Sequence, residues 1–144
     1  MENNYQNHYE KMPVIRIAPV YDGKIYVIPH NKHQIFDLPW MKQVNCHPNL
    51  KSTKQAQLLI RQETPAFNIK EHPRFSVKYA SPGNKDEKVY LYILPLSEEN
   101  EINFENGKFI VSDEIEENAH LYSEYLQKES GLLGMAAELW NDYL

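Results

Sequence analysis

A helix predicted between Ser52 and Thr64 constrains the fold more than any other segment of this chain. Its first residues, Ser52-Thr53-Lys54-Gln55, match a capping box, whose side chains satisfy the unpaired backbone N–H groups at a helix N-terminus. Apolar residues follow at helical spacing, and Pro65 ends the helix because proline has no N–H to continue it. Upstream, Phe36-Asp37-Leu38-Pro39-Trp40 predicts a short extended segment and a turn, since a residue before proline avoids helical backbone. The first half of the chain therefore has the order strand, Leu-Pro turn, loop and helix.

Strand and turn patterns surround this helix. Asp22-Gly23 is typical of a two-residue hairpin turn between two apolar strands. The uninterrupted apolar run Val89–Leu94 predicts a central strand that is covered on both faces. Ser112 or Asp113 is expected to cap a short acidic helix. Strands are predicted at 14–20, 25–29, 35–38, 75–79, 89–94 and 107–111, turns at 21–24 and 81–85, and a mostly helical segment at 121–144, bent or broken at Gly131 and Gly134.

The composition indicates one globular domain. With 144 residues, we expect residues 1–12 to form a flexible polar arm and residues 13–144 to form a single domain. The net charge of −5 does not indicate a nucleic-acid surface, although a local pocket can still attract a small anion. A single cysteine, an N-terminus unlike a signal peptide and the lack of a membrane-length apolar run favour a cytoplasmic location.

The order of these elements resembles the Nudix superfamily. Members of this superfamily have an α/β/α sandwich around a mixed sheet, and most hydrolyse a nucleoside diphosphate linked to another group. Their motif is G-x5-E-x7-R-E-U-x-E-E-x-G-U, where U is a bulky apolar residue, and a Leu-Pro-Gly-Gly turn usually precedes it. The resemblance covers about residues 13 to 140 and implies an α/β (α+β) fold of this type.

Most charged and glycine positions of the motif carry other residues here. Leu38 and Pro39 stand where the Leu-Pro of the turn stands, and Glu63 stands at the second residue of the Glu-Glu pair. The replacements are Trp40 and Met41 for the two glycines of the turn, Leu50 for the first glutamate, Leu58 and Leu59 for the Arg-Glu pair, Gln62 for the next glutamate and Pro65 for the final glycine. An intact motif uses its glutamates to hold Mg²⁺, which bridges phosphate oxygens and orients water. Glu63 is either a remaining metal ligand or a solvated helix residue.

The leading hypothesis is a Nudix-fold module that binds a small nucleotide-like or phosphate-bearing ligand, or another protein, with little or no hydrolysis. The aromatic C-terminal helix also suggests a homodimer as the assembly. The alternative is a divergent hydrolase that uses Mg²⁺ or Mn²⁺, with Glu63 and carboxylates such as Asp37 or Glu87 as its catalytic groups. In a third hypothesis, Cys46-His47-Pro48 resembles the site of isopentenyl-diphosphate isomerases, which are Nudix relatives; the other interpretation of this run is a loop without a chemical role.

Three residues are candidate ligand contacts. His30 and His33 with Asp37 either line a pocket mouth or bind a metal, or they are simply solvated loop residues. Trp40 either fills the cleft where the motif glycines would leave space or stacks on a planar ligand. His47 belongs to the Cys-His-Pro run, and Glu87 is either a further base or metal ligand or an ordinary turn acid.

Overall fold

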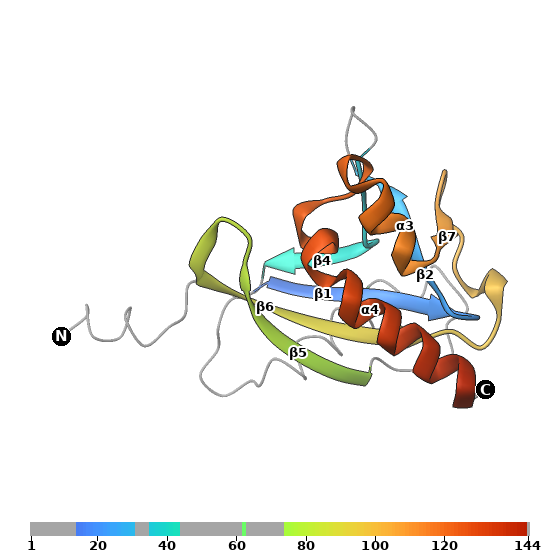
Figure 1. Cartoon of the computed structure of the whole chain (residues 1–144). Helices are drawn as coiled ribbons and strands as arrows, with labels where there is room; N and C mark the ends of the chain where they lie inside the picture. Colours follow the sequence, from blue (N-terminus) through green and yellow to red (C-terminus); the bar gives the residue numbers. More distant parts are fainter. Residues whose placement is uncertain (1–13, 31–34, 44–61, 63–73, 144) are drawn as a thin grey trace.

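The computed structural model describes residues 14–30, 35–43, 62 and 74–143. In this part, strands predominate in the first two thirds of the chain and helices follow (Figure 1). The elements are β1 (Val14–Tyr21), β2 (Lys24–Pro29), β3 (Phe36–Asp37), β4 (Trp40–Gln43), β5 (Arg74–Ser81), β6 (Asn84–Pro95), the 3₁₀ turn η2 (Glu99–Glu101), β7 (Lys108–Ile110), α3 (Ser112–Glu117), the 3₁₀ turn η3 (Ala119–Leu121) and α4 (Glu124–Tyr143).

The strands form one mixed sheet with the order β3-β2-β1-β6-β5. β1 and β6 are parallel, with Val14 paired with Val89, whereas the other pairs are antiparallel. β4 pairs with one end of β1, and β7 pairs with β2. The long strand β6 lies between β1 and β5, so the prediction of a central strand at 89–94 is confirmed. The expected α+β class with a mixed sheet is confirmed as well.

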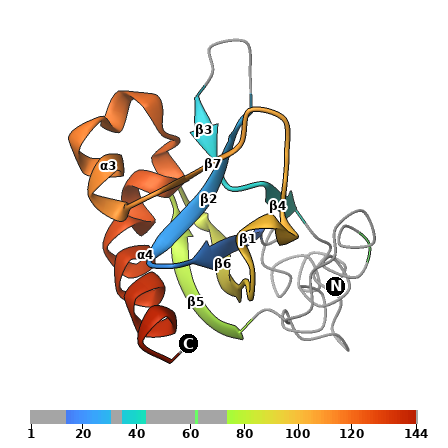
Figure 2. The ribbon, with the colours of Figure 1, turned by 90° about the vertical axis from the view of Figure 1, so that its right-hand side faces the viewer.

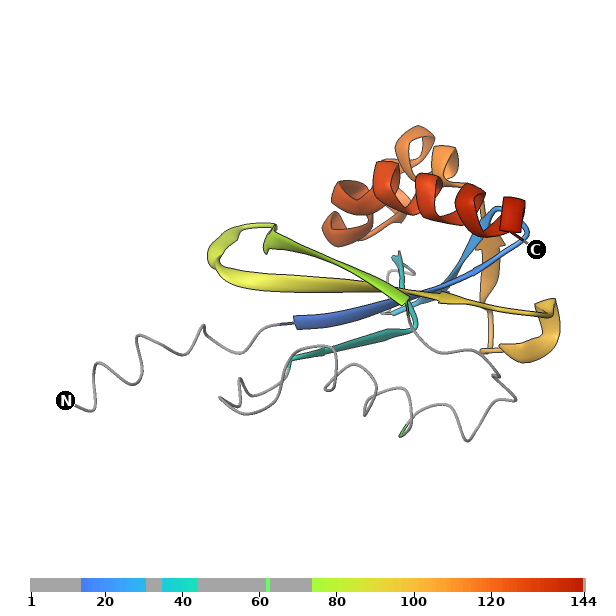
Figure 3. The same ribbon diagram turned by 90° about the horizontal axis from the view of Figure 1, so that it is seen from below.

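Both faces of the sheet are buried because apolar residues occupy both sets of alternating positions. In β1, Ala18 and Val20 belong to the core beneath α4, whereas Ile15 and Ile17 belong to a second core on the other face. β2 and β6 alternate in the same way. Figure 2 and Figure 3 show α3 and α4 together on one side of the sheet. Leu126, Leu133 and Ala137 form the buried stripe of α4 against this face.

Two tight turns have the backbone dihedral angles that their residues predict. Asp22 and Gly23 connect β1 to β2 with φ angles of 51° and 74°, and both signs match the hairpin turn expected for Asp-Gly. Gly83 has a φ of 78° in the Pro82-Gly83 turn between β5 and β6. Glycine adopts such positive φ angles without steric cost, so these turns set the register of both hairpins.

The structure differs from the sequence prediction in three details. Trp40–Gln43 is a strand, β4, although the sequence suggested only a turn there. Val111, rather than Ser112 or Asp113, is the residue before the first helical turn of α3, and it makes no side-chain cap. α4 is one helix through Gly131 and Gly134. The arm at 1–12 and most of the helix predicted at 52–64 lie outside the described residues.

The helices of the described residues carry charged side chains along their exposed sides. No helix within residues 74–143 is both long enough and apolar enough to span a membrane.

Candidate functional site

A buried arginine is the centre of the polar groups beneath α4. Arg16 is the third residue of β1 and is 0% exposed. Its Nη1 and Nη2 atoms donate to the two carboxylate oxygens of Asp37 in β3, at 3.1 and 2.7 Å. Its Nε and Nη2 atoms donate to the two carboxylate oxygens of Glu129 in α4, at 2.9 and 2.8 Å. One guanidinium therefore holds two carboxylates, each through two hydrogen bonds.

All five N–H groups of this guanidinium have a partner. The fifth donates to the Sδ atom of Met41 at 3.2 Å. The ring of Tyr125 lies 4.7 Å from the guanidinium carbon and covers one of its faces. Burial alone would lower the pKa of Arg16, but the charges and hydrogen bonds of Glu129 and Asp37 outweigh burial and hold it above its usual value. Arg16 therefore stays charged and is unavailable to an outside anion.

The two carboxylates make further hydrogen bonds within the protein. Asp37 accepts the backbone N–H of Leu38 at 2.8 Å, which fixes the start of the Leu-Pro turn. Glu129 accepts the hydroxyl of Tyr79 at 2.5 Å. Burial, followed by the charge of Glu129, raises the pKa of the Tyr79 hydroxyl above its usual range. We call Arg16, Asp37, Glu129 and Tyr79 the buried charge cluster.

Glu87 lies at the exposed margin of this cluster. The Tyr125 hydroxyl donates to its Oε1 atom, and Gln43 donates to its Oε2 atom, both at 3.3 Å. Ser81 lies 3.3 Å from the same Tyr125 hydroxyl. These hydrogen bonds are longer than those of Asp37, and Glu87 is only half-buried. The carboxylate of Glu87 is thus more accessible to solvent than that of Asp37 or Glu129.

Trp40 packs inside the second core. It is 4% exposed, and its ring meets Phe104 edge to face with a centroid distance of 6.0 Å. Its neighbour Met41 points the other way along β4 and is 44% exposed. In this conformation most of the indole is covered by protein, which leaves little of its face for a ligand. His30 is exposed at the end of β2, with its Nε2 atom 2.7 Å from the carbonyl oxygen of Leu38.

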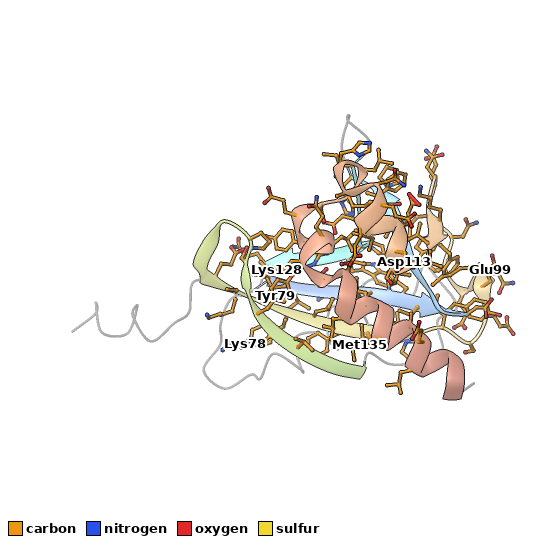
Figure 4. The ribbon with its side chains drawn as sticks, in the orientation of Figure 1. Lys78, Tyr79, Glu99, Asp113, Lys128 and Met135 are labelled. Carbon is orange, nitrogen blue, oxygen red and sulfur yellow. The ribbon has the colours of Figure 1, made fainter. Side chains whose placement is uncertain are left out.

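A polar hollow of about 730 Å³ opens on the side of the second core, beside β2, β7 and η2. Its wall carries charged and amide groups from Lys24, Glu99, Asn100 and Asn103, and Phe109 contributes a half-buried aromatic ring. Figure 4 shows Glu99 at this end of the sheet, far along β1 from the charge cluster. The volume is in the range of roughly 300–1,000 Å³ that is usual for small-molecule sites.

Comparison with solved structures decides the fold. A NUDIX-family hydrolase from Clostridium perfringens matches with a TM-score of 0.54 at 13% identity, over 93% of this chain and 99% of that one. The Ap4A hydrolase of C. elegans matches with a TM-score of 0.54 at 15% identity, over 89% and 98% of the two chains. The MutT protein of methicillin-resistant Staphylococcus aureus 252 matches with a TM-score of 0.54 at 11% identity, over 87% and 96%.

The chain has a Nudix-like fold. No family model matches the sequence, and no curated protein matches it either. At identities of 11–15%, the structural likeness concerns the fold alone.

The Nudix-like fold raises the question of a divalent metal, and the described carboxylates do not fit one. Asp37 and Glu129 direct their oxygens at Arg16, whose positive charge opposes a second cation at the same place. Among the residues that the structure describes, no group of three or more His, Cys, Asp or Glu side chains is placed to hold a metal ion. Gln62 is helical and exposed. Glu63 and His47, with Cys46, Leu58 and Leu59, lie outside the described residues.

Sequence reasoning missed Arg16 and Glu129 as members of a site. A signal existed for each. Arg16 interrupts the apolar run Val14–Ala18, and a charged residue inside a buried strand needs a charged or hydrogen-bonding partner. Glu129 shares a helical face with Leu126 and Leu133, where a solvated acid is not expected. Neither pattern indicates which residue the partner is.

Proposed function

We propose that this chain is a Nudix-fold binding protein with little or no hydrolase activity. The observation that carries the proposal is the buried charge cluster, in which the carboxylates of Asp37 and Glu129 both form ion pairs with Arg16. The sequence supports it independently, because Leu58, Leu59 and Gln62 stand where the motif has charged or carboxylate side chains. A hydrolase of this kind needs several oxygen ligands for Mg²⁺ and a group that activates water.

A small polar ligand is the favoured class of binding partner. The polar hollow offers an ammonium group from Lys24, two amides from Asn100 and Asn103 and the half-buried ring of Phe109, with Glu99 as its acidic group. This set of groups suits a ligand that carries both a planar ring and hydrogen-bonding or anionic groups, as nucleotides do. A titration of the full chain with ATP, ADP-ribose and Ap4A, followed by calorimetry, measures this binding. A Lys24→Ala variant is expected to weaken it, and binding unchanged by Lys24→Ala and Asn103→Ala would exclude the hollow.

The activity test uses the same compounds with Mg²⁺ or Mn²⁺, and chromatography follows the release of phosphate or nucleotide products. A Glu63→Gln variant is the matched control, because it removes the remaining motif carboxylate and keeps the side-chain shape. We expect the parent chain to release no more product than this variant. Efficient release that Glu63→Gln abolishes would overturn the proposal.

One observation favours the divergent hydrolase as a second candidate. Glu87 is half-buried and makes two long hydrogen bonds, so its carboxylate is accessible enough to accept a proton or contact a metal. In that case both Glu63→Gln and Glu87→Gln abolish turnover, whereas Glu138→Gln on the exposed side of α4 leaves it unchanged. Turnover that survives Glu87→Gln excludes this role for Glu87.

A further inference from the structure

An apolar groove runs between α4 and β5. It has a volume of about 300 Å³, with buried Leu91 and Ile93 at its floor and Leu132 along its wall. Its rim exposes large apolar side chains: Val77 is 37% exposed, and Met135 is 71% exposed. Leu139, 41% exposed, continues the rim along the helix. These three are half of the six large apolar residues that the described part of the chain exposes, so their clustering marks an interaction surface.

The groove lies at a free margin of the sheet. β5 is the last strand in the order β3-β2-β1-β6-β5, and it pairs with β6 and with no other described strand. The exposed side of α4 lies beside β5: Lys128 and Met135 of α4 and Tyr79 of β5 are labelled in Figure 4. A partner that approaches this margin therefore contacts α4 without obstruction from another described element.

A stripe of exposed residues along α4 carries opposite charges at its two ends. Lys128, Gly131, Met135 and Glu138 are exposed and recur at spacings of three and four residues, which is the pattern of a helix–helix seam. The basic residue lies toward the N-terminal end of this stripe and the acidic residue toward its C-terminal end. Two antiparallel copies therefore bring Lys128 of each copy near Glu138 of the other.

Gly131 adds a steric complement to the charges. A Cβ at Gly131 would meet nothing within 4 Å, so this position is an open depression in the helix surface. With a twofold axis at Met135, Leu139 of one copy lies opposite Gly131 of the other, and Lys128 lies within one helical turn of Glu138. Small residues opposite large ones let helices approach closely.

We propose that the groove and the exposed stripe of α4 form the interface of a homodimer, with two α4 helices antiparallel about a twofold axis at Met135. The two Met135 side chains meet at the axis and enter the grooves, where their flexible thioethers adapt to the apolar walls. Lys128 donates to the carbonyl oxygen of Ala80 at 2.8 Å, and its Nζ atom lies 5.5 Å from the centre of the Tyr79 ring, so the ammonium group is held at the edge of the groove with further donor capacity. This assembly is independent of whether the chain hydrolyses a ligand.

Sedimentation velocity of the full chain over a series of concentrations tests the proposal. We expect a monomer–dimer equilibrium that Met135→Lys weakens at least tenfold, since two buried ammonium groups would face each other at the axis. Val111→Ser is the matched control. It removes another exposed apolar side chain, and serine suits the residue before a helix, so the variant folds and associates as the parent does.

A charge exchange distinguishes this geometry from other contacts. Lys128→Glu and Glu138→Lys each place like charges together and weaken association, whereas the double variant Lys128→Glu/Glu138→Lys restores it to within about threefold of the parent. A chain that stays monomeric at all concentrations overturns the proposal, even where the groove then binds an apolar peptide. A dimer that Met135→Lys leaves intact, or that the double variant fails to restore, overturns it as well.

Discussion

At the scale of single residues, Arg16 is a position where substitution should be costly, because it is buried and pairs with two carboxylates. Arg16→Met keeps a similar length but leaves Asp37 and Glu129 buried without their cation. Removing one partner of a buried ion pair costs about 3–5 kcal/mol, because the remaining charge is desolvated and unpaired. We expect the free energy of unfolding, measured in urea, to fall by this amount in Arg16→Met. Tyr79→Phe, which removes one hydrogen bond to the charged Glu129, is expected to cost about 1.5–3 kcal/mol.

The control is an acid on the outer side of the same helix. Glu138 is exposed, so Glu138→Gln is expected to change the free energy of unfolding by less than about 0.5 kcal/mol at concentrations where the chain is monomeric. If Arg16→Met and Glu138→Gln lower the free energy of unfolding equally, the stabilising role of Arg16 is contradicted.

The individual members of this cluster differ in how far the sequence predicts them. Asp37 was a candidate ligand contact because of its grouping with His30 and His33, and the structure places its carboxylate against Arg16. Its bond to the Leu38 N–H is local and follows from the spacing of the residues. Its bonds to Arg16 and those of Glu129 join residues 21 and 113 positions apart. No local pattern contains such distances, so the ion pairs become visible only in the folded chain.

At the scale of elements, the two glycines of α4 are expected to respond in opposite ways to alanine. Gly131 has open space where a Cβ would stand, and alanine favours helix over glycine by about 1 kcal/mol. Gly131→Ala should therefore raise the free energy of unfolding, measured below the concentration at which the chain associates. At Gly134 a Cβ would collide with the hydroxyl of Ser112 in α3. The hydroxyl can rotate away, but the Cβ of Ser112 would still lie 3.1 Å from the new methyl group, so Gly134→Ala should lower the free energy of unfolding by about 1 kcal/mol.

A second substitution checks the cause at Gly134. Ser112→Ala removes the hydroxyl and keeps the Cβ, which lies 3.1 Å from the new methyl group. The double variant Gly134→Ala/Ser112→Ala should therefore recover part of the loss. Equal stability of Gly131→Ala and Gly134→Ala would show that the approach of α3 to α4 does not depend on this glycine.

These elements also show what a sequence can and cannot predict. The Asp22-Gly23 hairpin was predictable because its two φ angles are a property of the residues themselves. The strand β4 was not, because Trp40–Gln43 is extended through pairing with β1, a strand more than twenty residues earlier. Gly134 was interpreted as a bend or break in the helix, whereas it lets α3 pack closely against α4, a contact with no local signature.

At the scale of the whole molecule, the two sheet faces serve different purposes. One face, beneath α3 and α4, holds an apolar core together with the charge cluster at one end. The other face packs tyrosine, tryptophan and phenylalanine residues around the strand centres and opens into the polar hollow. Alternation along β1, β2 and β6 predicts that both faces are buried, but it does not distinguish the face with ions from the face with aromatic rings.

The stability of the whole fold should fall at alkaline pH because the buried Tyr122 and the half-buried Tyr79 resist ionisation. Burial, with the charge of Glu114 next, raises the pKa of Tyr122 from 10.0 to about 12, and burial with the charge of Glu129 raises that of Tyr79 further. A raised pKa in the folded state gives stability that is complete below pH 10, the unfolded value, and is lost as the pH rises toward 12. By pH 11 the loss of unfolding free energy at Tyr122 alone should be about 1 kcal/mol.

Urea unfolding at a series of pH values measures this loss, and absorbance at 295 nm follows tyrosinate formation. Tyr79→Phe/Tyr122→Phe should flatten this dependence above pH 10, since phenylalanine does not titrate; an equally steep fall in the double variant would assign the loss to other groups.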